Sequence, residues 1–176
     1  MLAQRSHEHC QIEAVELDPL AAQQAQENFK ASPWHNRLHL TRQDVQTYCQ
    51  QTAHQFDLIV ANPPYFAQGV ECKNDERALA RYVQQSHLDW LNWASSCLSE
   101  KGKISFVLPY EAGKTLINST ALYCIKQTDV ITKIGKTPQR MLLTFSKEAL
   151  PQMKERLIIC LLYTSPSSRD VEESRM

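Results

Sequence analysis

The chain has 176 residues, of which 43% are hydrophobic and 22% charged, so its length and composition are those of one ordinary globular domain. Lysine and arginine number 19 and so do aspartate and glutamate, which excludes neither a polyanionic partner nor a neutral one. No apolar run reaches the roughly 18 residues that a membrane span needs. We therefore expect no membrane-spanning segment.

Six cysteines are scattered along the chain without a Cys-x-x-Cys pair or a Cys/His cluster at zinc-ligand spacing. No metal site is expected, and the absence of a visible signal peptide predicts reduced thiols in the cytoplasm. The histidines are equally dispersed. His35, His39 and His54 are most simply surface or half-buried polar residues, and none is expected to be catalytic.

The first half of the chain predicts strands that alternate with helices. Residues Gln11–Leu17 indicate a strand, and Asp18-Pro19 is an N-cap followed by an N1 proline, which opens a helix to about Ala31. Ser32-Pro33 ends this helix. The next elements are a short strand at Leu38–Thr41, one or two helical turns at Val45–Thr52 and a strand at Phe56–Ala61.

The second half continues the alternation. Residues His87–Leu98 have apolar positions at helical spacing, and Glu100-Lys101-Gly102 is expected to stop that helix. Further strands are predicted at Lys103–Leu108, which Pro109 closes, at Met141–Phe145, and from Leu157 onward. Strands that alternate with helices are typical of an α/β fold with a parallel sheet.

The strand Phe56–Ala61 runs directly into Asn62-Pro63-Pro64-Tyr65. The two prolines fix φ and keep the residues before them out of helix, so the chain leaves the strand in a stiff, extended conformation. The Asn62 side-chain oxygen and the Pro63 carbonyl can accept two hydrogen bonds from one amino group, and Tyr65 offers a ring to stack on a flat substrate. The simpler alternative is that Pro-Pro merely ends the strand.

This arrangement fits methyl transfer to an exocyclic amine. The lone pair of an adenine N6 is delocalised into the ring, and hydrogen bonds to both of its protons draw the nitrogen toward tetrahedral geometry. Holding the nitrogen in line with a sulfonium methyl can lower the barrier by roughly 7–11 kcal/mol in favourable cases.

Two carboxylates follow the earlier strands. Glu16 lies at the end of the first strand, where an acid can bind the two hydroxyls of a ribose, and Asp18 is left to cap the helix. Asp44 follows the next strand and could accept from an adenine amino group, although capping of the Val45 segment explains it equally well. The functional interpretation is favoured by the order of these groups at the ends of three successive strands.

Two basic groups are candidates for nucleic-acid contact. One is Lys73, Arg77 and Arg81, and the other is Lys126, Lys133, Lys136 and Arg140. A solvated face is the simpler interpretation of each group.

The order of these motifs resembles the class I S-adenosylmethionine-dependent methyltransferases that methylate amino groups. Within that class, roughly residues 1–159 resemble the bacterial tRNA1(Val) (adenine(37)-N6)-methyltransferases. The segments that carry the resemblance are Gln26-Glu27-Asn28, Ser32-Pro33-Trp34, Phe56-Asp57-Leu58-Ile59, Asn62-Pro63-Pro64-Tyr65 with Gln68-Gly69-Val70-Glu71-Cys72, and Ala80-Arg81-Tyr82.

The resemblance implies a Rossmann-like α/β sheet, S-adenosyl-L-methionine as cofactor and the anticodon loop of tRNA as partner. Glu16 would hold the cofactor ribose and Asp44 the cofactor adenine, with Asn62 beside the cofactor. Asn62, Pro63, Pro64 and Tyr65 would form the catalytic turn, with Tyr65 stacked on the flipped-out adenine 37.

No glycine precedes Gly69, so the first strand and Gly-rich cofactor loop of the family have no counterpart in this chain. We expect a partial methyltransferase domain at 1–159 whose activity is impaired or lost. Residues 160–176 resemble the translation of a sequencing adapter and are expected to be a non-native tail.

Four hypotheses follow for the function. The first is tRNA adenine-N6 methylation, and the second is a protein-glutamine N5 or rRNA guanine N2 methyltransferase, which share the Asn-Pro-Pro-aromatic turn. The third is a non-catalytic RNA-binding remnant. The fourth, a nicotinamide-dependent dehydrogenase, explains the strand-end acid but leaves Asn-Pro-Pro-Tyr without a role.

Overall fold

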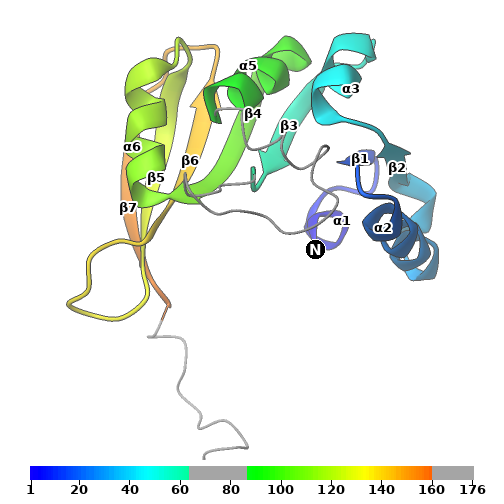
Figure 1. The fold of residues 1–176 in the computed structure, drawn as a ribbon, viewed down its shortest axis with the longest axis horizontal. Coiled ribbons are helices and arrows are strands. Elements are labelled where there is room, and N and C mark those ends of the chain that lie inside the picture. Colours follow the sequence, from blue (N-terminus) through cyan, green and yellow to red (C-terminus); the bar gives the residue numbers. More distant parts are fainter. Residues whose placement is uncertain (64–86, 160–176) are drawn as a thin grey trace, which may run out of the picture. The chain divides into compact units, whose positions relative to one another are not determined.

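The computed structural model describes residues 1–63 and 87–159, which form two compact units that divide after His54 (Figure 1). The second part of the catalytic turn (Pro64 and Tyr65), the Gln68–Cys72 motif, the first basic group and the 160–176 tail lie outside the described residues. The expected boundary at residue 159 stays a prediction.

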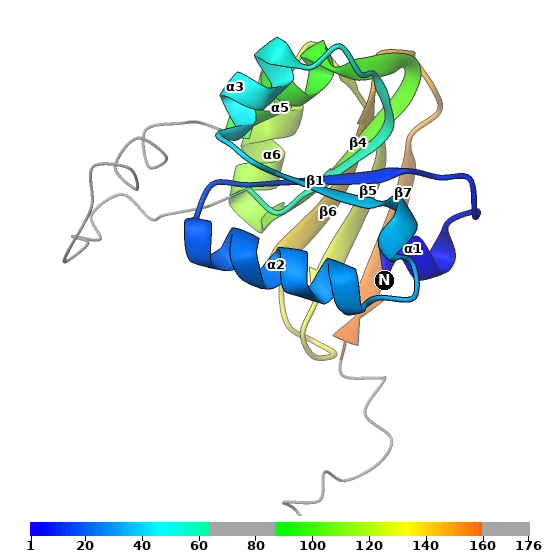
Figure 2. The ribbon, with the colours of Figure 1, turned by 90° about the vertical axis from the view of Figure 1, so that its right-hand side faces the viewer.

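The first unit contains a two-stranded parallel sheet. Its elements are α1 (Leu2–Arg5), β1 (Ile12–Glu16), α2 (Pro19–Ala31), η1 (His35–Arg37), β2 (Leu38–Arg42) and α3 (Val45–Gln51). Strands β1 and β2 pair in register from Ile12↔Leu38 to Glu16↔Arg42. Helices α2 and α3 lie on opposite sides of this sheet (Figure 2).

Local signals explain the bounds of α2 and α3. Asp18 caps α2 through an Oδ1 that accepts a hydrogen bond from the Ala21 N–H at 2.8 Å, and Pro19 occupies the first helical position. Helix α2 ends at Ala31 with Ser32 as its C-cap, as predicted. Asp44 caps α3 in the same way, accepting from the Thr47 N–H at 2.9 Å. The strands and helices predicted for this unit are therefore confirmed.

Arg37 ties the start of the first unit together. Its guanidinium is buried and donates to the Ser6 hydroxyl at 2.9 Å and to the carbonyls of His7, Cys10 and Ala3. Carbonyl oxygens at the end of a short helix lack intrahelical partners, and the five N–H donors of one guanidinium can serve several of them. Arg37 thus fixes the path of the chain from α1 into β1.

The second unit is a five-stranded mixed sheet in the order β3-β4-β6-β5-β7. Its elements are β3 (Phe56–Ala61), α5 (His87–Ser96), β4 (Leu98–Pro109), α6 (Tyr110–Ser119), β5 (Tyr123–Ile131), β6 (Arg140–Ser146) and β7 (Met153–Ile158). Strands β3 and β4 are parallel, as the alternation predicted, but β6 runs antiparallel to both β4 and β5. Element α6 and strand β5 were not predicted.

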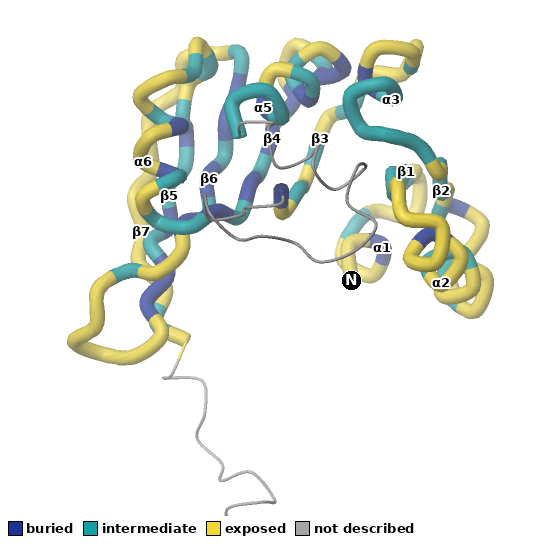
Figure 3. Tube along the Cα trace, in the orientation of Figure 1, coloured by how far each residue is buried: buried dark blue, intermediate teal, exposed yellow. Residues whose placement is uncertain are grey.

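The core of the second unit lies between the sheet and helices α5 and α6. Fully buried side chains come from α5, from the central strands β4 and β6 and from α6, among them Leu91, Phe106, Leu116 and Phe145 (Figure 3). Burial of such side chains contributes roughly 1.5–3 kcal/mol each. This core holds β3 and β4 side by side, and the predicted catalytic turn begins at the carboxyl end of β3.

Predicted boundaries of α5, β4 and β7 are wrong, and β7 begins at Met153 rather than at Leu157 and ends at Ile158. The Glu100-Lys101-Gly102 segment does not stop a helix but belongs to β4, while α5 ends earlier, at Ser96. The reason is tertiary: Phe56 pairs with Leu98, Leu58 pairs with Lys103, and the residues between form an irregularity in β4. Packing against β3 overrides the helix-stop signal of the local sequence.

Candidate active site

Glu16 and Asp44 lie at the carboxyl ends of the two strands of the first unit's sheet. Glu16 is the last residue of β1, Asp44 follows the end of β2, and the Gln43 N–H donates to the Glu16 carbonyl at 3.1 Å. The Glu16 side chain is half-buried, and its Oε1 accepts from the Asp18 N–H at 2.9 Å. The structure therefore brings the two predicted cofactor-binding carboxylates together at the carboxyl ends of parallel strands, where open α/β sheets bind ligands.

The two carboxylate acceptors fit the sugar hydroxyls and the base amino group of a nucleoside. The backbone hydrogen bond from Asp18 orients the Glu16 carboxylate, and no other contact engages that side chain within the described part of the chain. The second oxygen can thus accept from a ribose diol. Asp44 uses Oδ1 for the Thr47 N–H and also accepts from the Thr47 hydroxyl at 3.2 Å. A role for Asp44 in capping is observed, and a role in adenine binding stays a prediction.

Asn62 and Pro63 lie at the carboxyl end of β3 in the second unit. Pro63 is fully buried and the Asn62 side chain is exposed. Burial of the proline beside the sheet anchors the turn, while exposure of the asparagine amide leaves its oxygen accessible to a substrate. The predicted use of the Asn62 oxygen and the Pro63 carbonyl as acceptors for one amino group stays a prediction.

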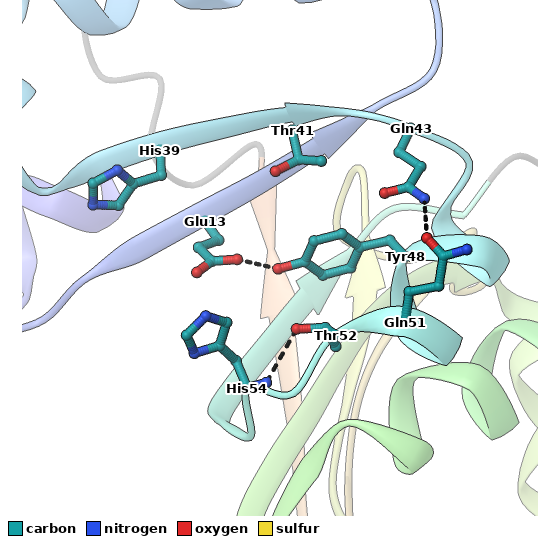
Figure 4. A pocket seen from close by; sticks show the side chains of 8 residues that line it. All are labelled: Glu13, His39, Thr41, Gln43, Tyr48, Gln51, Thr52 and His54. Atoms are coloured by element: carbon teal, nitrogen blue, oxygen red, sulfur yellow. Dashed lines mark hydrogen bonds between the residues drawn. The ribbon is translucent and has the colours of Figure 1, made fainter.

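A separate cavity of about 340 Å³ lies in the first unit (Figure 4). It is lined by polar side chains of β1, β2 and the end of α3: Glu13, His39, Thr41, Gln43, Tyr48, Gln51, Thr52 and His54. Tyr48 donates its hydroxyl proton to the Glu13 carboxylate, and Gln43 donates to Gln51 at 2.9 Å. None of the predicted site residues lines this cavity. The sequence could not single out Glu13 and Tyr48, because only folding brings residues 35 positions apart into contact.

None of the cysteines in the described part of the chain is among the predicted site residues. Cys10 is exposed, Cys49 and Cys97 are buried, and burial raises the pKa of the Cys124 thiol, which favours its neutral form.

Residues 1–63 and 87–159 contain no group of three or more side chains suited to holding a metal ion. No helix within those ranges has the length and apolarity to span a membrane.

Comparison with known proteins decides the family. The Methyltransferase small domain family matches residues 1–120. A tRNA1(Val) (adenine(37)-N6)-methyltransferase from Haemophilus influenzae strain PittEE is 68% identical over 159 residues, which cover 90% of this chain and 68% of that protein. The enzyme of the same name from Pasteurella multocida is 59% identical over 160 residues, with the same coverage of 90% and 68%.

The chain belongs to the tRNA1(Val) (adenine(37)-N6)-methyltransferase family. Its members are enzymes that use S-adenosyl-L-methionine as methyl donor, so the predicted enzyme class and cofactor are confirmed. Membership favours the first of the four hypotheses over the protein-glutamine, rRNA-guanine and dehydrogenase alternatives.

Solved structures confirm the class I methyltransferase fold. A predicted O-methyltransferase from Agrobacterium tumefaciens matches with a TM-score of 0.65 and 16% identity, over 93% of this chain and 76% of that protein. TrmN from Thermus thermophilus matches with a TM-score of 0.58 and 16% identity, over 84% of this chain and 39% of that one. At these identities the likeness concerns the fold alone.

Proposed function

We propose that this chain transfers a methyl group from S-adenosyl-L-methionine to the exocyclic N6 of adenine 37 in the anticodon loop of tRNA1(Val). The observation that carries the proposal is the 68% identity to an enzyme of that name. A match of 159 residues in a chain of 176 must include Asn62-Pro63-Pro64-Tyr65. The proposal is supported further by the exposed Asn62 on a turn that the buried Pro63 anchors.

The cofactor supplies an electrophilic methyl group on a sulfonium. Glu16 would accept hydrogen bonds from the ribose hydroxyls and Asp44 would accept from the adenine amino group, which would hold the cofactor at the carboxyl ends of β1 and β2. Side-chain oxygens at strand ends suit this task because the sheet and the helix caps fix their positions. The Asp18 N–H bond to Glu16, at 2.9 Å, keeps one carboxylate in place before the cofactor arrives.

Asn62 and Pro63 orient the attacking nitrogen. The Asn62 side-chain oxygen and the Pro63 carbonyl accept hydrogen bonds from the two N6–H groups, Pro64 keeps the turn rigid, and Tyr65 stacks on the flipped-out base. Held by Glu16 and Asp44, the cofactor would supply the methyl group that the N6 lone pair accepts. One N6 proton then leaves to solvent. Most of the rate enhancement comes from positioning and from the preorganised acceptors.

Asn62→Ala tests the proposal directly. Removing one preorganised hydrogen-bonding group from an active site typically lowers kcat by about 10²–10³-fold. We expect a loss of that size in transfer of a tritiated methyl group from the cofactor to tRNA1(Val), with the product identified as N6-methyladenosine at position 37 by nuclease digestion and mass spectrometry. The dissociation constant for tRNA should change by less than about threefold.

The matched control is Asn118→Ala. Asn118 is exposed on α6 and its side chain forms no hydrogen bond within the described residues, so its loss should leave turnover unchanged. Turnover of Asn62→Ala equal to that of the unaltered chain would reject the role of the turn. Absence of methyl transfer by the unaltered chain would reject the function for residues 1–176 and favour the RNA-binding alternative.

A further inference from the structure

The loop between β5 and β6, residues 132–139, emerges at the same end of the second unit's strands as Asn62. Strand β3 is parallel to β4, with Ala61 opposite Phe106. Strand β6 is antiparallel to β4, with Pro109 opposite Arg140, and Arg140 is also opposite Val130 of β5. The end of β5 and the start of β6 therefore lie beside the carboxyl ends of β3 and β4. Figure 1 shows the loop extending beyond the end of the sheet.

Backbone hydrogen bonds define the shape of this loop. The Gln139 N–H donates to the Val130 carbonyl at 3.0 Å and closes its base, and the Lys136 N–H donates to the Lys133 carbonyl at 3.1 Å. Gly135, the third residue of that turn, has a φ of 78°, the value that a type II turn requires there. The turn places Ile134 at the tip, where 69% of its surface is exposed.

The loop is also tied to helix α6. The Tyr110 N–H, at the start of α6, donates to the Gln139 carbonyl at 3.1 Å. The ammonium group of Lys114 lies 4.7 Å from the centre of the Tyr110 ring. An aromatic ring and a further cation therefore stand at the base of the loop, on the side of the sheet that α6 covers.

The two lysines of the loop differ in their surroundings from three lysines of this unit that form ion pairs. Lys126 pairs with Glu155 at 3.0 Å, Lys114 with Glu111 at 3.1 Å and Lys147 with Glu100 at 3.7 Å. Lys133 and Lys136 are exposed and make no ion pair with any described residue, and residues 132–139 contain no acidic side chain. The second basic group of the sequence thus separates into Lys126, which is paired with Glu155, Arg140 in β6, and a loop whose two lysines make no ion pair with a described residue.

We propose that residues 132–139 form an RNA-binding loop that holds the backbone of the tRNA next to the adenine presented to Asn62. Lys133 and Lys136 contact phosphates, and Ile134 packs against the apolar face of a ribose or an unstacked base. The proposal rests on the proposed function and extends it to the recognition of the tRNA. The proposal gives a role to an exposed isoleucine that lies between two lysines without ion pairs, at the end of the strands where the proposed catalytic turn begins.

The test is the salt dependence of RNA binding by the full 176-residue chain. The probe is an in vitro transcript of tRNA1(Val), and binding is measured by fluorescence anisotropy at 50, 100 and 200 mM KCl. Removing one lysine that binds a phosphate should reduce the slope of log K against log salt by about one. For the double variant K133Q/K136Q we expect the dissociation constant at 100 mM KCl to rise about tenfold and the slope to fall by about one to two.

Two further variants sharpen the result. K101Q/K103Q removes the same charge from exposed lysines at the opposite end of β4, and its affinity should stay within about twofold of the unaltered chain. I134S should weaken binding severalfold at every salt concentration and leave the slope unchanged, because it removes an apolar contact and no charge. Circular dichroism melts of all variants should coincide, since every substituted side chain is exposed.

Equal reductions in affinity in K133Q/K136Q and K101Q/K103Q would overturn the proposal, because nonspecific charge attraction would then explain the binding. An unchanged slope in K133Q/K136Q, or no RNA binding by the unaltered chain at 50 mM KCl, would overturn it as well. Binding that depends on the loop without any methyl transfer would support the loop and reject the proposed function, so the two failures are distinguishable.

Discussion

At the scale of single residues, the Asp44 carboxylate has one observed role, as the cap of α3, and one proposed role, in binding the cofactor adenine. Its Oδ1 caps α3 by accepting from the Thr47 N–H, which is one of the two interpretations that the sequence left open. The other interpretation, a contact with the cofactor adenine, requires the same side chain to reach beyond the end of β2. A substitution that keeps the cap and shortens the side chain can separate the two.

Asp44→Ser is that substitution. Serine is about as good an N-cap as aspartate, so the free energy of unfolding in urea should change by less than about 0.5 kcal/mol, whereas Asp44→Ala should lower it by about 1 kcal/mol. If Asp44 also holds the adenine, the dissociation constant for S-adenosylmethionine, measured by calorimetry, should rise about tenfold in Asp44→Ser. Equal cofactor affinity in Asp44→Ser and the unaltered chain would leave Asp44 with the cap alone.

At the scale of elements, the pairing of β3 with β4 positions the catalytic turn, and Gly102 is the residue that permits it. A Cβ at position 102 would lie 2.7 Å from Leu98 Cδ1 and 2.8 Å from the Phe56 carbonyl oxygen. The Leu98 side chain is fully buried and the carbonyl belongs to the backbone of β3, so neither can move aside at little cost.

Gly102→Ala should therefore lower the free energy of unfolding by about 1–3 kcal/mol, measured by urea denaturation. The control is Gly113→Ala in α6, where the nearest atom to a Cβ is the flexible Met141 sulfur at 3.0 Å and where alanine favours helix by about 1 kcal/mol. We expect Gly113→Ala to change stability much less than Gly102→Ala. Equal stability of Gly102→Ala and the unaltered chain would show that β3 and β4 tolerate a wider separation.

At the scale of the whole molecule, the chain divides into two units that carry different proposed roles. Glu16 and Asp44, proposed to bind the cofactor, belong to the first unit, while Asn62 and Pro63, proposed to bind the substrate, belong to the second. The match to the Haemophilus enzyme extends over 159 residues, and β7 ends at Ile158. Residues 1–159 are therefore proposed as the methyltransferase part of the chain.

Truncation after residue 159 tests that boundary. We expect the chain of 1–159 to keep the melting temperature, cofactor affinity and methyl-transfer rate of the 176-residue chain, because the described sheet is complete without the last 17 positions. Scanning calorimetry and the methyl-transfer assay supply the comparison. A drop of several degrees in the melting temperature would show that the tail contributes to the fold. The expectation of impaired activity stays a prediction, which the same assay measures.

Local signals in the sequence account for many of the helices, strands and predicted site residues of this protein. The caps at Asp18 and Asp44, the prolines that follow β3 and the apolar strands depend on the chemistry of adjacent residues, and for that reason they could be predicted. Asn62-Pro63-Pro64-Tyr65 and the strand-end acids indicated amino-group methylation on the same basis. The fold class and the family were confirmed by the comparisons.

Contacts between distant residues required the tertiary structure. The antiparallel course of β6, the extension of β4 through Gly102 and the guanidinium bonds of Arg37 depend on partners far away in the sequence. The distinction between Lys126, which pairs with Glu155, and the unpaired lysines of the 132–139 loop has the same origin. A charge in the sequence has no partner until folding supplies one. The sequence therefore determined where the cations are, and the tertiary structure decided which of them form ion pairs within the described residues.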